Sequence, residues 1–299
     1  MNRTDLHGFV PAIVTPFAAD GAIDEGAFRD IAAWLIGNGA TGLCIAGDNG
    51  ESWALSPAER GRLTALAKEV GGAGVPIISG SSAPTLDASL AYARAARDNG
   101  ADALLMMPPT YVLKGTADEV LRRFDRVAAD CGLPIVAYNS PRRAGHSMPL
   151  DLIGRLIEET PVIGIKESDR DFPRLGRLIH DYGSRMQVMV GPSYFLLPGL
   201  ALGAAGFIAT GPELLGPDAG RLVDVARDKP GEEYRRLHHQ LSEIYQVLMA
   251  TGTWPAALKA ALAILGQPAG TPRDPVLPLD EKARADLAES MTALGLTRV

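Results

Sequence analysis

A single lysine stands at the end of an apolar run near the middle of the chain. The run from Val162 to Ile165 is followed directly by Lys166 and Glu167. A lysine at the end of a buried strand loses hydration, and the neutral amine that this favours can attack a carbonyl carbon to form a Schiff base. A structural lysine in a salt bridge is the alternative, but the chain has only six lysines and the other five lie in predicted helices or loops. We therefore predict that Lys166 is the nucleophile of a carbonyl reaction.

A tyrosine and an arginine follow another apolar run in the same way. Tyr138 ends the run that begins at Pro134, and Arg143 comes shortly after it. A phenol at a strand end can move protons to and from a carbinolamine or a substrate hydroxyl. An arginine just beyond it can bind a carboxylate through two parallel hydrogen bonds. A lone tyrosine here would more often be a packed core residue, but its place beside the strand of Lys166 favours a catalytic role.

A glycine-rich turn follows a third apolar run and contains Asp48 and Asn49 between Gly47 and Gly50. The backbone amides of such a turn can bind an anion, and the carboxylate of a keto acid is the expected ligand. The motif is weak by itself, because many such stretches are only turns. Two further loops, residues 108–111 and 191–193, also follow apolar runs and are expected to line the same opening.

The elements that must position these side chains repeat along the chain. Eight short apolar runs alternate with longer segments of helical period, and the runs lack the in-and-out alternation of a half-exposed strand. They cover residues 9–14, 42–46, 76–79, 103–107, 134–138, 162–165, 187–190 and 206–209. Eight strand-helix units in sequence favour a closed (β/α)8 TIM barrel, an α/β fold, over a doubly wound open sheet, which usually has fewer strands. In such a barrel the active site lies where the strands end.

Helix boundaries are marked by capping residues. Asp24, Ser56, Thr85 and Thr116 stand before amphipathic segments, and Asn-Gly or Cys-Gly pairs precede the next strands. The segment 37–42 matches the dinucleotide-binding pattern G-x-G-x-x-G, but it follows a helix and precedes a strand, so we interpret it as a helix cap. Beyond residue 229, helices are expected near 232–251, 254–265 and 280–294, with a proline-rich loop at 267–279. We predict a barrel domain of residues 1–229 and a C-terminal helical extension of residues 230–299.

Composition excludes several classes of function. The formal net charge is −6, and no block of basic residues offers a surface for nucleic acid or for an anionic membrane. The N-terminus has no signal-peptide pattern and no window of 18 apolar residues occurs, so we expect a cytoplasmic protein. Cys44 and Cys131 are expected to be buried free thiols. The five histidines do not cluster with carboxylates, so no metal is expected.

Taken together, these motifs resemble the dihydrodipicolinate synthase / N-acetylneuraminate lyase family of class I, lysine-dependent aldolases. The resemblance covers essentially the whole chain: the opening at residues 8–17, G-x-x-G-E at 47–51, the Tyr-Asn-x-Pro motif at 138–141, Gly-x-Lys-Glu at 164–167 and the helical tail. It implies a TIM barrel, usually a homotetramer built as a dimer of dimers, that needs no cofactor.

The resemblance also implies roles for individual residues. Lys166 would form the imine with pyruvate or a related 2-keto acid, and Tyr138 would relay protons. Gly191 and Ile208 would line the pyruvate pocket, and Tyr111 would reach into the site of the neighbouring subunit.

The chain departs from the family pattern inside G-x-x-G-E, where Asp48 and Asn49 replace the usual pair of hydroxyl residues. Asp48 puts a carboxylate where the synthases use a threonine of their proton relay, so it is expected to act as a base or to bind a substrate hydroxyl. Asn49 can still offer its backbone and side-chain amides to the keto-acid carboxylate. Arg143 occupies the position at which the synthases hold the second substrate's carboxylate. Because Thr110 replaces an aromatic residue of the lysine-inhibited synthases, we expect millimolar L-lysine to leave the activity unchanged.

Three functions stay open at this stage. The first is a Schiff-base lyase or synthase that condenses pyruvate or another 2-keto acid, as 4-hydroxy-tetrahydrodipicolinate synthase does. The second, which Asp48 favours, is an aldolase or dehydratase of a 2-keto-3-deoxy sugar acid, which shares the imine step. The third is a barrel that binds keto acids without turnover, since a fold does not dictate a function. A binder would be stabilised by ligand without releasing a product.

Overall fold

The computed structural model of the chain describes residues 1–110, 114–228 and 230–297. Eight parallel strands form one curved sheet in the order β1-β8-β7-β6-β5-β4-β3-β2. The strands are β1 (Gly8–Phe9), β2 (Leu43–Ile45), β3 (Ile77–Gly80), β4 (Ala103–Met106), β5 (Ile135–Asn139), β6 (Val162–Glu167), β7 (Gln187–Val190) and β8 (Gly206–Phe207). The two edges of the sheet meet where Ala12 pairs with Cys44. The predicted (β/α)8 barrel is thereby confirmed, and the doubly wound open sheet is excluded.

The first and last strands are shorter than their apolar runs. The run 9–14 was expected to be one strand, but β1 pairs with β8 only at Gly8 and Phe9. On the β2 side there are two isolated pairs, Phe9 with Ala40 and Ala12 with Cys44, with a gap between them. Pro11 explains the gap, because proline has no backbone N–H to donate to a ladder. Gly206 starts β8 against β1, and a Cβ there would lie 2.3 Å from backbone atoms of Gly8. Only glycine permits this close approach.

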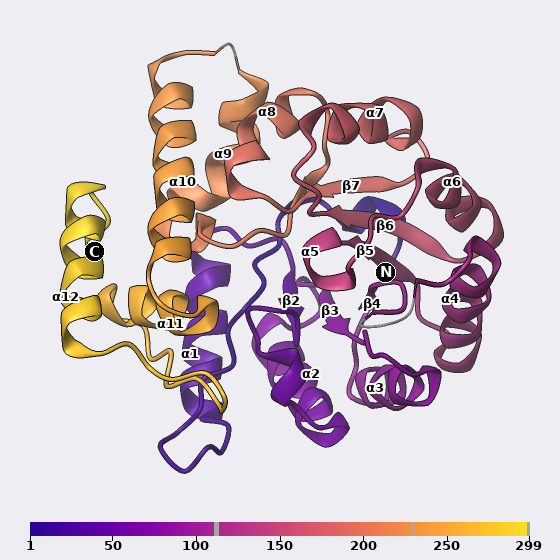
Figure 1. Cartoon of the computed structure of the whole chain (residues 1–299), viewed down its shortest axis with the longest axis horizontal. Helices are drawn as coiled ribbons and strands as arrows, with labels where there is room; N and C mark the ends of the chain where they lie inside the picture. The colour runs from indigo at the N-terminus through magenta and orange to yellow at the C-terminus, as the bar shows by residue number, and fades with distance from the viewer. Residues whose placement is uncertain (111–113, 229, 298–299) are drawn as a thin grey trace.

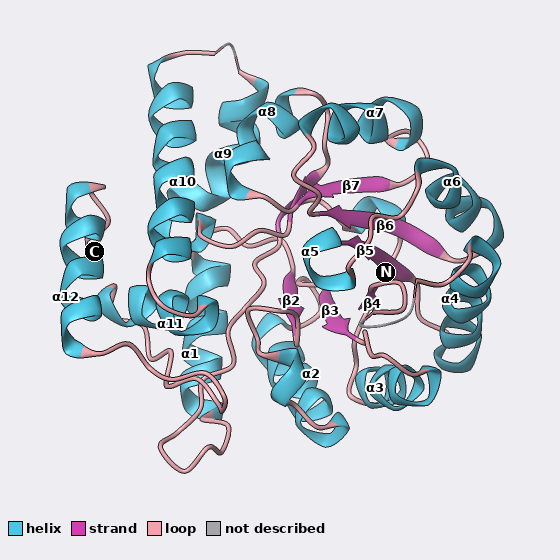
Figure 2. Cartoon of the chain, in the orientation of Figure 1, coloured by secondary structure: helices cyan, strands magenta, loops and turns pink. Residues whose placement is uncertain are grey.

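Helices surround the strands on the outside (Figures 1 and 2). They are α1 (Glu25–Gly37), α2 (Pro57–Gly71), α3 (Leu86–Asp98), α4 (Ala117–Cys131), α6 (Leu150–Glu159), α7 (Phe172–Tyr182), α8 (Leu196–Ala201) and α9 (Asp218–Arg227), while the short α5 (Pro141–Ala144) follows β5 directly. The four predicted helix starts are confirmed. In each, the capping side chain accepts a hydrogen bond from a backbone N–H of the first helical turn, as seen for Asp24, Ser56, Thr85 and Thr116. The segment 37–42 is indeed a helix end, with Gly39 at a φ of 89°.

Inward-facing side chains fill the barrel and outward-facing ones pack under the helices. The inner cluster includes Val136 and Tyr138 of β5, Met189 of β7 and Ile208, while Ile135 and its outward-facing equivalents pack against the helices. Cys44 and Cys131 are buried free thiols as expected. Burial raises the pKa of the Cys44 thiol to about 11, so the thiol stays protonated at neutral pH.

The C-terminal helices are α10 (Glu232–Ala250), α11 (Trp254–Ile264) and α12 (Glu281–Ala293). Each agrees with its predicted range to within one residue at either end. Helix α10 packs against α8, α9 and the 3-10 turn η3 (Ser193–Phe195), and Figure 1 shows the three helices in orange and yellow beside the barrel. The division of the chain at residue 230 stays a prediction. Within the described residues, no helix combines the length and the apolar character needed to cross a membrane.

Candidate active site

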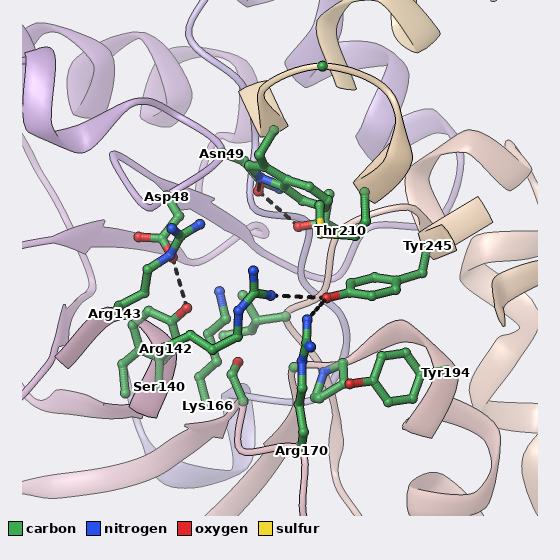
Figure 3. A pocket seen from close by; sticks show the side chains of 18 residues that line it. Asp48, Asn49, Ser140, Arg142, Arg143, Lys166, Arg170, Tyr194, Thr210 and Tyr245 are labelled. Carbon is green, nitrogen blue, oxygen red and sulfur yellow. Dashed lines mark hydrogen bonds and ion pairs between the residues drawn. The ribbon is translucent and has the colours of Figure 1, made fainter. Parts of the chain in front are cut away.

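A cavity of about 280 Å³ opens where the strands end. Its walls come from the segments that follow β2, β5, β6, β7 and β8 and from the C-terminal helices, as Figure 3 shows. Seven of the eight residues singled out from the sequence line it: Asp48, Asn49, Tyr138, Arg143, Lys166, Gly191 and Ile208. The eighth, Tyr111, lies outside the described residues. The parallel strands therefore bring together side chains from positions 48 to 208.

Lys166 lies on β6 directly beside Tyr138 on β5, because the two residues are paired in the strand register. Its side chain is buried, with 6% of the residue exposed. The Nζ atom lies 4.4 Å from the centroid of the Tyr138 ring. In the part of the chain that the structure describes, Nζ has neither a hydrogen-bond acceptor nor a carboxylate partner. The amine thus faces the cavity and is available to a ligand there.

Tyr138, Asp48 and Arg143 form a connected chain of polar groups. The Tyr138 hydroxyl donates to Asp48 Oδ2 over 3.0 Å, and Arg143 Nε donates to the same oxygen over 3.0 Å. Burial, and then the charge of Asp48, raise the pKa of Tyr138 well above its ordinary value, so the phenol stays protonated at neutral pH. Tyr138 therefore holds a proton that it can donate to a ligand, and Asp48, held by Arg143, orients the hydroxyl until then.

The side chain of Asn49 forms hydrogen bonds to three separate segments of the chain. Its Nδ2 donates to the carbonyl of Ala12 over 2.9 Å, and its Oδ1 accepts from Thr210 Oγ1 at 2.8 Å and from Trp254 Nε1 at 3.0 Å. The residue is 2% exposed. These contacts tie the side chain to the segments after β1 and β8 and to α11, and they use one of the two Nδ2 hydrogens. That the side-chain amide reaches a substrate stays a prediction. Its backbone amide has no acceptor among the described residues and stays available.

Gly191 and Ile208 form the part of the wall beyond β7 and β8. A Cβ on Gly191 would lie 2.0 Å from Ser168 Oγ and 2.7 Å from the carbonyl oxygen of Glu167. Only glycine allows the segments after β6 and β7 to approach this closely. Ile208 is fully buried in the inner apolar cluster. The cavity thus has apolar lining residues beside its polar groups.

The residue after Lys166 holds the strand end in place. Glu167 is 1% exposed, and its Oε1 accepts from Asn139 Nδ2 at 2.7 Å and from the backbone N–H of Asp169 at 2.8 Å. Arg174 lies 3.4 Å from the other carboxylate oxygen. Burial nevertheless raises the pKa of Glu167. These contacts lock the end of β6 to β5 and α7, which orients Lys166.

Reasoning from the sequence missed several lining residues. Arg142 adjoins the chosen Arg143, and Arg170 follows β6, so a wider search of strand-end loops would have found both. Tyr194 stands in the loop after β7, and the same search would reach it. Tyr245 and Trp254 come from α10 and α11. No local signal marks these last two, because only the packing of the extension on the barrel brings them to the cavity.

No three His, Cys, Asp or Glu side chains meet as a metal site would require across residues 1–110, 114–228 and 230–297. The titratable side chains that line the cavity are instead one amine, several guanidinium groups, phenols and the Asp48 carboxylate. Such a set suits an anionic carbonyl compound, because the cations can bind carboxylates and the amine can react with the carbonyl.

Comparison with known proteins identifies the family. The dihydrodipicolinate synthetase family matches residues 5–294. A DapA-like lyase of Halobacterium salinarum is 35% identical, over 97% of this chain and 95% of the relative. A 4-hydroxy-tetrahydrodipicolinate synthase of Synechococcus sp. (strain WH7803) is 31% identical, over 99% of this chain and 98% of the relative. A prophage protein of the dihydrodipicolinic acid synthase family from E. coli K12, solved in complex with pyruvate, has a TM-score of 0.91 at 26% identity, covering 97% of this chain and 99% of that one. The chain therefore belongs to the dihydrodipicolinate synthetase family and is a lyase of that family.

Proposed function

We propose that the protein forms a Schiff base between Lys166 and pyruvate or another 2-keto acid, and then makes or breaks a bond next to the imine. The observation that carries the proposal is the buried amine of Lys166, which faces the cavity beside Tyr138 and has no acceptor among the described residues. Pyruvate is favoured as the keto acid because the related E. coli K12 protein was solved in complex with it.

The residues around Lys166 supply the proton transfers. The amine adds to the keto carbon, and the carbinolamine then loses water to give the imine. In the resting site the Tyr138 hydroxyl keeps its proton and donates a hydrogen bond to Asp48. When the hydroxyl turns to the carbinolamine, it gives that proton to the departing oxygen, and the tyrosinate takes a proton back from the carbon next to the imine. The backbone amide of Asn49 is left to bind the keto-acid carboxylate. Arg143 donates to Asp48 Oδ2 over 3.0 Å, so it acts on the chemistry by positioning Asp48.

A second candidate reaction is favoured by Asp48 itself. A carboxylate 3.0 Å from the Tyr138 hydroxyl can remove a proton or accept a hydrogen bond from a substrate hydroxyl, which a threonine would do less well. An aldolase or dehydratase of a 2-keto-3-deoxy sugar acid would use both abilities. In the dehydratase the imine acidifies the adjacent carbon, a base takes its proton, and the β-hydroxyl leaves as water.

Reductive trapping tests the imine step. The protein is incubated with pyruvate, reduced with borohydride, and analysed by intact mass and peptide mapping beside the Lys166→Met variant. We expect one adduct on Lys166, no adduct on the variant, and no adduct on the other buried lysine, Lys259, which serves as an internal control. Absence of an adduct from pyruvate and from longer 2-keto acids would overturn the proposal.

A substrate panel then separates the reactions. Release of pyruvate from a 2-keto-3-deoxy sugar acid indicates an aldolase, and loss of water without pyruvate release indicates a dehydratase. Consumption of pyruvate only when an aldehyde is added indicates a synthase. Thermal stabilisation by keto acids without any product would favour the non-catalytic binder. The homotetramer that the family resemblance implies is tested separately by sedimentation velocity.

A further inference from the structure

Three side chains from separate segments meet at one side of the cavity. Arg142 lies on α5, Arg170 follows β6, and Tyr245 lies on α10. Arg142 Nη1 donates to the Tyr245 hydroxyl over 3.1 Å, and Arg170 Nη2 donates to the same oxygen. Figure 3 shows both guanidinium groups directed at that oxygen from different sides. Two cations are thus gathered around one neutral hydroxyl.

Neither charge is paired with a carboxylate in the part of the chain that the structure describes. Within the described residues, Arg142 and Arg170 form no ion pair with a carboxylate, and the side-chain hydrogen bond of each goes to Tyr245. Arg143 differs, because its Nε lies 3.0 Å from Asp48. Two like charges held near one oxygen repel each other, and an anion bound between them would remove that repulsion. The charge distribution therefore favours an anion at Arg142 and Arg170 over one at Arg143.

The Tyr245 hydroxyl adds a donor to this group. Its ring packs edge-on against Tyr194, with centroids 5.0 Å apart, and lies 6.4 Å from the ring of Trp254. Its oxygen accepts from both arginines, and its own proton has no acceptor among the described residues. A phenol donates one hydrogen bond and a guanidinium group has five N–H groups. The three side chains thus present unused donors, which the oxygens of an anion can accept.

These donors share one cavity with Lys166. The cavity has a volume of about 280 Å³, and one water takes roughly 30 Å³ in the liquid. A three-carbon keto acid is only a few times larger than a water, so it leaves part of the cavity unfilled. We propose that Arg142, Arg170 and Tyr245 bind a carboxylate at the far end of a 2-keto acid whose keto group reacts with Lys166. The inference rests on the proposed function, because it takes the keto carbon to be held at Lys166. It names the substrate class as longer 2-keto acids with a second acid group.

Pairs of 2-keto acids matched in length test this site. We would trap the imine with borohydride over a range of concentrations and compare 2-oxoglutarate with 2-oxopentanoate, and 2-oxoadipate with 2-oxohexanoate. Within each pair only the terminal carboxylate differs. In the unmodified protein at least one diacid should reach half-saturation at a concentration about tenfold or more below its monoacid partner, as expected for charge-assisted hydrogen bonds.

The ratio of interest is the half-saturation concentration of the monoacid divided by that of its diacid partner. It should move toward one in each of three variants, Arg142→Gln, Arg170→Gln and Tyr245→Phe, with the larger change in the arginine variants. Both concentrations are measured on the same variant, so a general loss of folding or of imine formation affects both acids alike and leaves the ratio unchanged. Arg284→Gln is the matched control, since it removes the same charge from an exposed residue of α12 and should keep the ratio. Equal half-saturation of acids in both pairs, or a ratio unchanged in both arginine variants, would overturn the site. Failure to trap even pyruvate would instead overturn the proposed function.

Discussion

Two buried lysines of this protein lie over aromatic rings, yet their surroundings differ. Lys166 is 6% exposed and its Nζ lies 4.4 Å from the Tyr138 ring, while Lys259 is 2% exposed and its Nζ lies 4.5 Å from the Phe17 ring. Lys259 forms an ion pair with Glu51 and donates to the carbonyl of Thr271 over 2.7 Å. No described residue offers Lys166 either kind of partner. Both lysines are therefore buried, and they differ in that Lys259 has an ion-pair partner and a hydrogen-bond acceptor.

The difference teaches which buried cation can react. The ion pair compensates Lys259 for lost hydration and keeps it charged, although burial still lowers its pKa. Glu51 is also held from the other side, because its Oε2 accepts the backbone N–H of Arg273 at 2.9 Å. This pair joins the turn after β2 to α11 and to the loop beyond it. Lys259 thus fastens α11 and the loop beyond it to the barrel, whereas the Lys166 amine has no such partner among the described residues and can meet a ligand.

The largest effect is expected from Lys166→Met, the substitution that removes the free amine. Turnover of any keto-acid substrate should fall at least about a thousandfold, because the nucleophile is lost. Stability should be unchanged or slightly higher, since the amine forms no bond within the described residues. Steady-state kinetics and urea unfolding of the same preparation measure both quantities. A variant that keeps more than a few per cent of its turnover would contradict the assignment.

The same substitution at the other lysine, Lys259→Met, should act on stability instead. Removal of one partner leaves the Glu51 carboxylate buried and unpaired, which costs about 3–5 kcal/mol of the free energy of unfolding. Urea denaturation measures the loss, and trapping with pyruvate should still modify Lys166 in the folded fraction.

A double variant, Lys259→Met with Glu51→Gln, provides the control. It should recover part of the lost stability, because no uncompensated charge stays buried. The comparison between the two lysines fails if Lys259→Met unfolds no more easily than Lys166→Met, or if a fully folded Lys259→Met protein no longer traps pyruvate.

A buried carboxyl that forms no ion pair within the described residues extends the comparison to acids, with a somewhat smaller effect. Glu213 is 4% exposed and accepts the N–H of Gly211 at 2.7 Å. Burial raises its pKa from 4.5 to about 7, against the opposing charge of Lys166. Between these pH values the folded state holds a proton that the unfolded state has released. The contribution of Glu213 to the free energy of unfolding is therefore fully present below pH 4.5. It is lost as the pH rises through 7, which lowers the free energy of unfolding by up to about 3 kcal/mol.

The test of this pH dependence uses Glu213→Gln, which keeps an oxygen for the Gly211 N–H but cannot ionise. Free energies of unfolding are measured for both proteins from pH 4.5 to pH 8. The difference between them should change with pH in that window, with the unmodified protein losing more stability toward pH 8. Parallel curves would mean that Glu213 is ionised in the folded protein throughout.

Much of the fold and part of the site followed from local patterns. The apolar runs, the capping residues and the glycines at helix ends act over a few neighbouring residues, and parallel strands place their ends on one side by geometry. For this reason Lys166, Tyr138 and Asp48 could be expected at one opening. The length of β1 was misjudged because Pro11 interrupts the ladder inside an apolar run, which hydropathy does not register.

The sequence by itself determined the barrel, its order of elements and the residues that stand at the strand ends, because these depend on local propensity and on period. Only the tertiary structure decided how those residues are paired. It joined Lys259 to Glu51, gave Lys166 no partner among the described residues, tied the Asn49 side chain to Trp254, and brought Tyr245 of α10 to Arg142 and Arg170. Each of these contacts links segments far apart in the chain. The reactivity of a buried charge depends on such neighbours, which no local pattern specifies.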